Sequence, residues 1–164
     1  MKKISYRGGF ISYSDTGSGI PLVLLHGYLE TAEVWNSFAV KLASQFRVIC
    51  IDLPGHGGSD LFGETHTMEF MAEAVNGLLE ELDTDRVFMV GHSMGGYVTL
   101  AFLDLFPGKL LGYCLFHSQP FADQPAALEK RQREISLVNE GQKDLIIPGN
   151  IERMYATDNL EKFA

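Results

Sequence analysis

The stretch from residue 86 to residue 107 constrains the fold more than any other part of the sequence. Residues 86–90 form a short, almost wholly apolar run, which is typical of a buried parallel strand. The residues after Gly96 are apolar on nearly every side and stop at Pro107, which indicates a buried helix. The few residues between them leave room only for a sharp turn with Ser93 at its tip.

The glycines around Ser93 have the spacing that such a turn requires. A strand that reverses directly into a helix brings the two backbones close together, and Gly91 and Gly95 stand where larger side chains would collide. The residue at the tip is held in strained backbone geometry and its side chain is pushed out above the sheet. We therefore expect Ser93 to be exposed at a helix N-terminus, whose N–H groups favour a developing negative charge.

Apolar strand and helix patterns alternate along the rest of the chain. Strands are predicted at residues 3–6, 10–14, 21–25, 47–51 and 110–116, the first two as a hairpin. Helices are predicted at residues 32–43 and after Thr67, a predicted N-cap. The apolar face of the first helix consists of Val34, Trp35, Phe38, Ala39 and Leu42. This alternation predicts an α/β fold, a mostly parallel, doubly wound sheet with helices on both faces.

Polar segments follow four of the predicted strands. They are His26-Gly27, the irregular loop 52–59, the turn at Ser93, and His117-Ser118. Ligands of open parallel sheets bind beyond the carboxyl ends of the strands. We therefore expect these four segments to converge on one site.

Composition excludes several classes of function. The 164 residues are 46% hydrophobic, enough for one sizeable core, and the net charge of −8 argues against a nucleic-acid partner. No run indicates a signal peptide or a membrane span, so we expect a cytoplasmic protein without membrane partners. Cys50 and Cys114 lie in apolar strand patterns and are predicted to be buried, reduced thiols. There is no Gly-x-Gly-x-x-Gly or P-loop pattern, which argues against a nucleotide-binding domain.

Three motifs together resemble the α/β-hydrolase fold superfamily, in its small serine esterase and lactonase-like branch. They are His26-Gly27, Asp52-Leu53-Pro54-Gly55-His56-Gly57-Gly58-Ser59 and Gly91-His92-Ser93-Met94-Gly95-Gly96. The resemblance covers residues 3 to about 116. It implies that Ser93 is the nucleophile and that the N–H groups of Met94 and Tyr28 form an oxyanion hole. The residues expected to line the pocket are His26, Gly27, His92 and His117.

The base and the acid of a catalytic triad are harder to place. In the superfamily both follow the serine, after strands that lie beyond residue 164 here. His117 remains open as a base because its strand should neighbour that of Ser93, and Asp123 remains open as the acid. His26 and His56 belong to structural loops, and His66 is expected to be solvated.

The character of the chain changes after residue 117. An amphipathic helix is predicted over residues 123–139, with Gly141 as its stop, and a second, shorter helical piece in residues 143–164. The resemblance implies that residues 118–164 begin a helical cap, and that residues 1–117 are the N-terminal part of the core. A plain surface helix pair is the alternative.

The resemblance implies a cofactor-free, metal-free hydrolase of a small carboxylic ester, lactone or thioester, acting through an acyl-enzyme on Ser93. Serine instead of aspartate at the turn argues against epoxide hydrolase and dehalogenase chemistry. A lyase or perhydrolase on the same scaffold, or a catalytically incomplete fragment that folds by association, are the alternatives. Because the strand 110–116 is uncharged and would form a free edge, we expect a homo-oligomer or association with the missing C-terminal half. The cap usually sets the substrate, so the sequence does not identify it.

Overall fold

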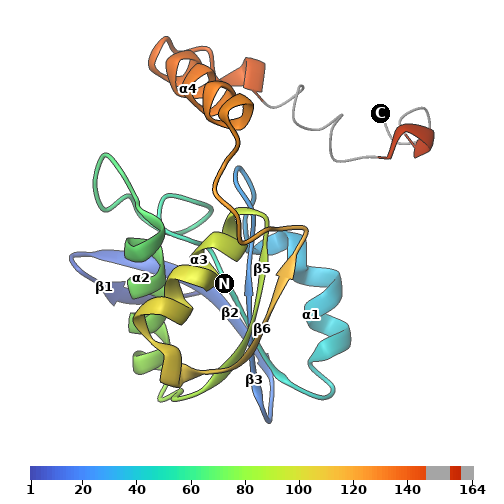
Figure 1. The fold of residues 1–164 in the computed structure, drawn as a ribbon. Coiled ribbons are helices and arrows are strands. Elements are labelled where there is room, and N and C mark those ends of the chain that lie inside the picture. Colours follow the sequence, from blue (N-terminus) through green and yellow to red (C-terminus); the bar gives the residue numbers. More distant parts are fainter. Residues whose placement is uncertain (147–155, 160–164) are drawn as a thin grey trace. The chain divides into compact units, whose positions relative to one another are not determined.

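The computed structural model describes residues 1–146 and 156–159. The chain divides into two compact units, residues 1–120 and 121–164. The first unit contains a six-stranded sheet with the strand order β1-β2-β4-β3-β5-β6 (Figure 1). Its strands are β1 (Lys2–Tyr6), β2 (Gly9–Gly17), β3 (Pro21–Leu25), β4 (Arg47–Ile51), β5 (Val87–His92) and β6 (Leu110–Phe116). Its helices are η1 (Ala32–Trp35), α1 (Asn36–Leu42), α2 (Met68–Glu81), α3 (Met94–Leu105) and η2 (Pro107–Lys109).

Four neighbouring strands of the sheet are parallel. β3 pairs in parallel with both β4 and β5, and β5 pairs in parallel with β6, whereas β1 and β2 are antiparallel. The carboxyl ends of β3, β4, β5 and β6 therefore meet at one edge. The predicted α/β class, with a mostly parallel sheet, is confirmed.

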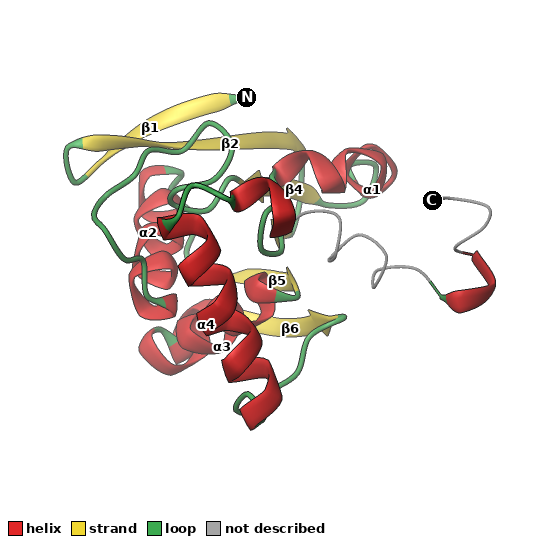
Figure 2. Ribbon diagram, turned by 90° about the horizontal axis from the view of Figure 1, so that it is seen from above, coloured by secondary structure: helices red, strands yellow, loops and turns green. Residues whose placement is uncertain are grey.

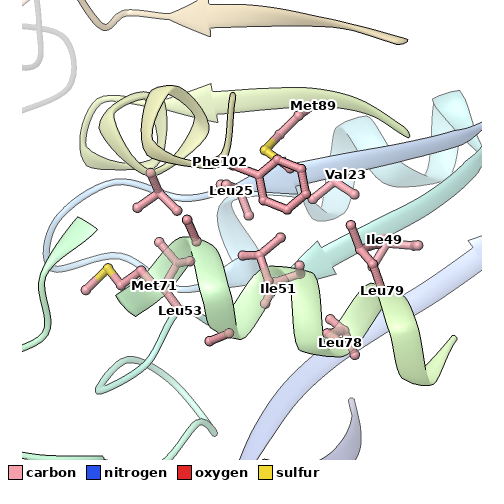
Figure 3. Close-up of a cluster of buried hydrophobic side chains, with 14 of the residues drawn as sticks. Val23, Leu25, Ile49, Ile51, Leu53, Met71, Leu78, Leu79, Met89 and Phe102 are labelled. Atoms are coloured by element: carbon pink, nitrogen blue, oxygen red, sulfur yellow. The ribbon is translucent and has the colours of Figure 1, made fainter. Parts of the chain in front are cut away.

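Helices cover both faces of the sheet. Helices α2 and α3 lie on one face and α1 on the other (Figures 1 and 2). Thr67 caps α2 as predicted, because its hydroxyl accepts the N–H of Phe70 at 3.1 Å. The apolar stripe of α2 packs against alternate side chains of the central strands, such as Val23 and Ile49, and against Phe102 of α3 (Figure 3). Each such buried aliphatic or aromatic side chain contributes about 1.5–3 kcal/mol.

The helix predicted at residues 32–43 forms in two pieces. A 3₁₀ turn, η1, precedes α1. Trp35 and Ala39 are buried as expected, but Val34 and Phe38 are 44% and 48% exposed. A 3₁₀ turn has three residues per turn instead of 3.6, so the apolar face predicted for one continuous helix is split.

The prediction for the two cysteines is half wrong. Both are free thiols and Cys50 is buried, but Cys114 is exposed. β6 is the last strand of the sheet, so Cys114 has a neighbouring strand on one side only. The apolar pattern around Cys114 predicted burial, but such a pattern does not show whether another element covers the strand.

The second unit contains helix α4 (Pro125–Asn139) and the short turns η3 (Lys143–Leu145) and η4 (Thr157–Asn159). Pro125 occupies the first helical turn and Gly141, with φ 75°, follows the helix end. Most of the predicted helical piece in residues 143–164 lies outside the described residues, and the division at residue 117 and the role of a cap stay predictions. No helix in the described ranges is long and apolar enough to cross a membrane.

Candidate active site

Ser93 lies at the sharp turn between β5 and α3, as predicted. Its backbone has φ 48° and ψ −111°, a conformation that costs a non-glycine residue about 1–3 kcal/mol. The flanking glycines are required by close packing. A Cβ on Gly91 would lie 2.2 Å from the carbonyl oxygen of Gly95, and one on Gly95 would lie 2.6 Å from that of Leu25. The strain at Ser93 is therefore built into the close packing of β5, α3 and β3.

The end of β6 holds this turn in place. The N–H of Ser93 donates to the carbonyl of Phe116 at 3.1 Å. The hydroxyl of Ser118 donates to the carbonyl of Ser93 at 2.8 Å, and the N–H of Gly96 donates to the same oxygen at 2.9 Å. The sequence placed Ser118 at this edge but did not indicate that it fixes the turn.

The two residues expected to supply oxyanion donors lie at the same edge. Met94 is the first residue of α3, so its N–H belongs to the positive end of a twelve-residue helix. Tyr28 lies in the loop that follows β3, residues 26–31, which we call the β3 loop. Leu25 of β3 is paired in register with Gly91 of β5, which brings the β3 loop beside the turn at Ser93. Their role as donors stays a prediction.

His26 supports the β3 loop from inside the protein. Its Nδ1 donates to the carbonyl of Gly27 at 2.8 Å, and its Nε2 accepts the N–H of Leu53 at 3.0 Å. The side chain has no exposed surface, and burial lowers the pKa of His26. The ring is therefore neutral and joins the loops after β3 and β4.

The loop after β4 is organised by Asp52. Its carboxylate accepts the N–H of Ala32 at 2.8 Å and that of Gly58 at 3.0 Å. His56 contributes a ring contact, with its centroid 5.1 Å from that of His26. The expectation of a solvated His66 is wrong: its Nε2 accepts the N–H of Phe62 at 3.0 Å, and burial lowers its pKa.

A glutamate that the sequence reasoning did not single out connects the β3 loop to β5. Oε2 of Glu30 accepts the N–H of Gly27 at 2.7 Å and Nδ1–H of His92 at 2.8 Å. Burial alone would raise the pKa of Glu30, but the hydrogen bonds from His92 and Gly27 outweigh it and hold the pKa below its usual value. Its only local signal was a polar residue three positions after Gly27.

His117 lies next to this group. It has φ 47°, is exposed, and its ring centroid lies 4.6 Å from that of Phe116 and 6.3 Å from that of His92. In the described part of the chain, no hydrogen bond joins the Ser93 hydroxyl to a histidine or a carboxylate. Asp123, the other open candidate, is hydrogen-bonded to Arg131, which lowers the pKa of Asp123.

Among the described residues, no group of three or more His, Cys, Asp or Glu side chains could hold a metal ion. At the carboxyl edge of the sheet, Ser93 lies at the N-terminus of α3 with the β3 loop beside it. This arrangement is suited to attack on a carbonyl carbon.

The parallel sheet and the strained turn at Ser93 together define an α/β protein with a serine between a strand and a helix N-terminus. The chain belongs to the alpha/beta hydrolase fold family, whose profile matches residues 20–148.

The match to each similar protein covers only part of that protein's length. A pimeloyl-[acyl-carrier protein] methyl ester esterase of Aeromonas hydrophila is 35% identical over 67% of this chain and 42% of its own length. A soluble epoxide hydrolase of a Corynebacterium species is 37% identical over 63% of this chain and 41% of its own length. The solved structure of a thermophilic esterase from Thermogutta terrifontis has 30% identity and a TM-score of 0.91, over 99% of this chain and 62% of that chain. This chain thus spans less than half of the two curated relatives and about three fifths of the solved esterase.

Proposed function

We propose that Ser93 is the nucleophile of a serine hydrolase acting on a small carboxylic ester, lactone or thioester. The observation that carries the proposal is the strained φ of 48° at Ser93, at the junction of β5 and the N-terminus of α3. Strain of this kind clusters at functional sites, because folding alone gains nothing from it. Esterases among the similar proteins support the same reading.

The proposed reaction is acyl transfer through Ser93. The Ser93 oxygen forms a bond to the carbonyl carbon while a base takes its proton, and the carbonyl oxygen becomes an oxyanion near the N–H groups of Met94 and Tyr28. Collapse of this intermediate breaks the bond from the carbonyl carbon to the alcohol oxygen or thiol sulfur, which takes up the proton, and leaves an acyl-serine. With a lactone, the freed hydroxyl stays attached to the acyl chain. Water then releases the carboxylic acid and restores the serine.

The identity of residue 93 distinguishes ester from epoxide chemistry. A carboxylate that opens an epoxide forms an ester, which water can hydrolyse at its carbonyl. A serine that opened an epoxide would form an ether, which has no carbonyl for water to attack. Ser93 therefore favours the esterase relatives over the epoxide hydrolase relative as guides to function.

Covalent capture tests the proposal. After prolonged incubation with a fluorophosphonate, the adduct located by peptide mass spectrometry is expected on Ser93, and Ser93→Ala should form none. Ser37→Ala, which changes an exposed serine on α1, is the matched control and should be labelled like the unaltered protein. An adduct confined to another serine would refute the assignment.

A further inference from the structure

Glu30 joins the two segments that carry the proposed oxyanion donors. One oxygen, Oε2, receives both the Gly27 N–H at 2.7 Å and Nδ1–H of His92 at 2.8 Å. The side chains of Glu30 and His92 are only 15% and 23% exposed, so water competes weakly for these bonds. Hydrogen bonds to a carboxylate are about twice as strong as those between neutral groups.

The β3 loop needs such an anchor because its own turn is weak. Leu29 has φ 61°, a left-handed conformation that costs a leucine about 1–2 kcal/mol. Its side chain is half exposed, so burial offsets little of this cost. The backbone bond that closes the turn, from the N–H of Glu30 to the carbonyl of Gly27, is long at 3.4 Å. The carboxylate of Glu30 is therefore the stronger of the two ties across the turn.

Close packing around Gly27 shows that the three groups are fitted to one another. A Cβ on Gly27 would lie 2.9 Å from Oε2 of Glu30 and 2.9 Å from Nδ1 of His92. A larger residue at position 27 would push the carboxylate away from the imidazole.

The imidazole of His92 is itself held firmly. Because a carboxylate only accepts hydrogen bonds, Nδ1 of His92 carries a proton. The ring packs against Trp35 and Phe116, with centroid distances of 6.4 and 6.0 Å. His92 is also the residue directly before Ser93. The group to which Glu30 is bonded is therefore fixed to the turn that carries the proposed nucleophile.

We propose that Glu30 is a positioning residue that fixes the backbone N–H of Tyr28 relative to Ser93. The inference rests on the proposed function. Tyr28 lies between Gly27, which the carboxylate holds directly, and Leu29, whose strained conformation the carboxylate maintains. Without the carboxylate the turn relaxes, and the Tyr28 donor loses its fixed distance from the Met94 donor.

Nuclear magnetic resonance of the 164-residue chain tests the anchor without any turnover. In the unaltered protein, the Gly27 amide proton should resonate at low field and exchange slowly, and the ring ¹⁵N shifts of His92 should report a protonated Nδ1. Glu30→Gln should weaken both signatures, moving the Gly27 amide proton upfield and speeding its exchange, because an uncharged amide oxygen accepts more weakly than a carboxylate. Glu33→Gln, which changes an exposed glutamate three residues later, should leave them intact. A Gly27 amide unchanged in Glu30→Gln would overturn the proposal.

Residual hydrolysis of p-nitrophenyl acetate tests the positioning. Complete loss of one oxyanion donor costs ~10²–10³ in kcat, so a loosened donor should cost on the order of 10-fold, with KM unchanged. His92→Asn retains an N–H near the position of Nδ1 and should stay within about threefold of the unaltered protein, whereas His92→Phe should match Glu30→Gln. The double variant Glu30→Gln/His92→Phe should have a kcat no lower than that of either single variant, because both substitutions break the same hydrogen bond between Glu30 and His92.

The outcomes separate the two proposals. Hydrolysis by Ser93→Ala at the unaltered rate would refute the proposed function and leave the spectroscopic test of Glu30 standing. An unaltered kcat for Glu30→Gln beside an inactive Ser93→Ala would refute the role of Glu30 alone, as would equal losses in His92→Asn and His92→Phe.

Discussion

Nε2 of His26 accepts the backbone N–H of Leu53 at 3.0 Å, and this bond ties the loop after β3 to the loop after β4. A protonated imidazole cannot accept a hydrogen bond, so the link exists only while His26 is neutral. Burial lowers the pKa of His26 below its ordinary value of 6.5. Protonation of this one ring therefore couples the solvent pH to the loops that surround Ser93.

We predict that the free energy of unfolding falls as the pH drops below about 6.5. In that range the unfolded chain binds a proton at His26 that the folded chain excludes, so the stabilisation is complete above pH 6.5 and is lost toward the folded pKa. His66, whose pKa is lowered in the same direction, adds to the slope. His26→Gln, which keeps an acceptor but does not titrate, should flatten the slope of melting temperature against pH.

Asp15→Asn is the matched control for this experiment. The hydrogen bond from Arg47 lowers the pKa of Asp15 below 3.8, so the contribution of Asp15 is constant between pH 5 and 8 and is lost only in stronger acid. The variant should be less stable at every pH in that window, with the slope retained. If the slope of melting temperature against pH is unchanged in the double variant His26→Gln/His66→Gln, the prediction is wrong.

The glycine at position 91 should tolerate no side chain. Gly91→Ala places a methyl group 2.2 Å from a carbonyl oxygen of the α3 backbone, so we expect a loss of about 3 kcal/mol or more in urea denaturation, or failure to fold. Gly108→Ala is the control, because nothing lies within 4 Å of its added Cβ and its φ is negative. It should change stability by less than about 0.5 kcal/mol. Similar losses in both variants would show that close packing at the turn is not the cause.

We predict that the purified 164-residue chain hydrolyses activated esters slowly. The described residues offer Ser93 no hydrogen-bonded base, so only the oxyanion and binding effects remain, about 10³–10⁴ over the rate in water. Labelling by a fluorophosphonate should accordingly take much longer than for an intact esterase assayed in parallel. Rapid stoichiometric labelling that His117→Ala abolishes would instead identify His117 as the base.

Local patterns sufficed for the parts of the fold that local physics determines. The strands at residues 21–25, 47–51 and 110–116 have their predicted bounds, and Thr67 caps α2, because apolar runs and capping hydroxyls act within a few residues. The motif at Ser93 likewise contains its own steric reason. The glycines on either side of the serine leave the strand and the helix no alternative to a sharp turn.

The parts that depended on distant residues could not be predicted. Glu30 acquires its role from His92, which is 62 positions away in the sequence. His66 looked solvated because its partner, the N–H of Phe62, belongs to an irregular loop that no periodicity describes. The exposure of Cys114 depends on what packs over β6, and the apolar pattern of the strand does not reveal whether anything does.

The outer edge of β6 is apolar. Strand β6 has no charged residue, and its side chains at Leu111, Tyr113 and Phe116 are 40%, 49% and 36% exposed. Beside it, an apolar groove of about 370 Å³ lies on the face of the sheet, lined by Leu22, Phe46, Phe88, Val90, Tyr113 and Cys114. Lysines, prolines and bulges protect natural edge strands. Strand β6 contains no lysine or proline, and its one irregularity lies near its start, between the pairs Val87–Leu110 and Phe88–Gly112.

Contact of this apolar surface with water costs about 25 cal/mol per Å². We therefore expect another polypeptide to cover this surface. One of its strands would pair with the edge of β6, and one of its helices would pack over the groove. In the purified protein we expect a second copy of the chain to take this place. Light scattering after size exclusion should give a mass above the 18.2 kDa of one chain. Tyr113→Lys should shift the mass toward the monomer, whereas Val40→Lys, on the exposed side of α1, should not. A stable monomer at high concentration, with Cys114 freely reactive toward thiol reagents, would show that β6 needs no cover.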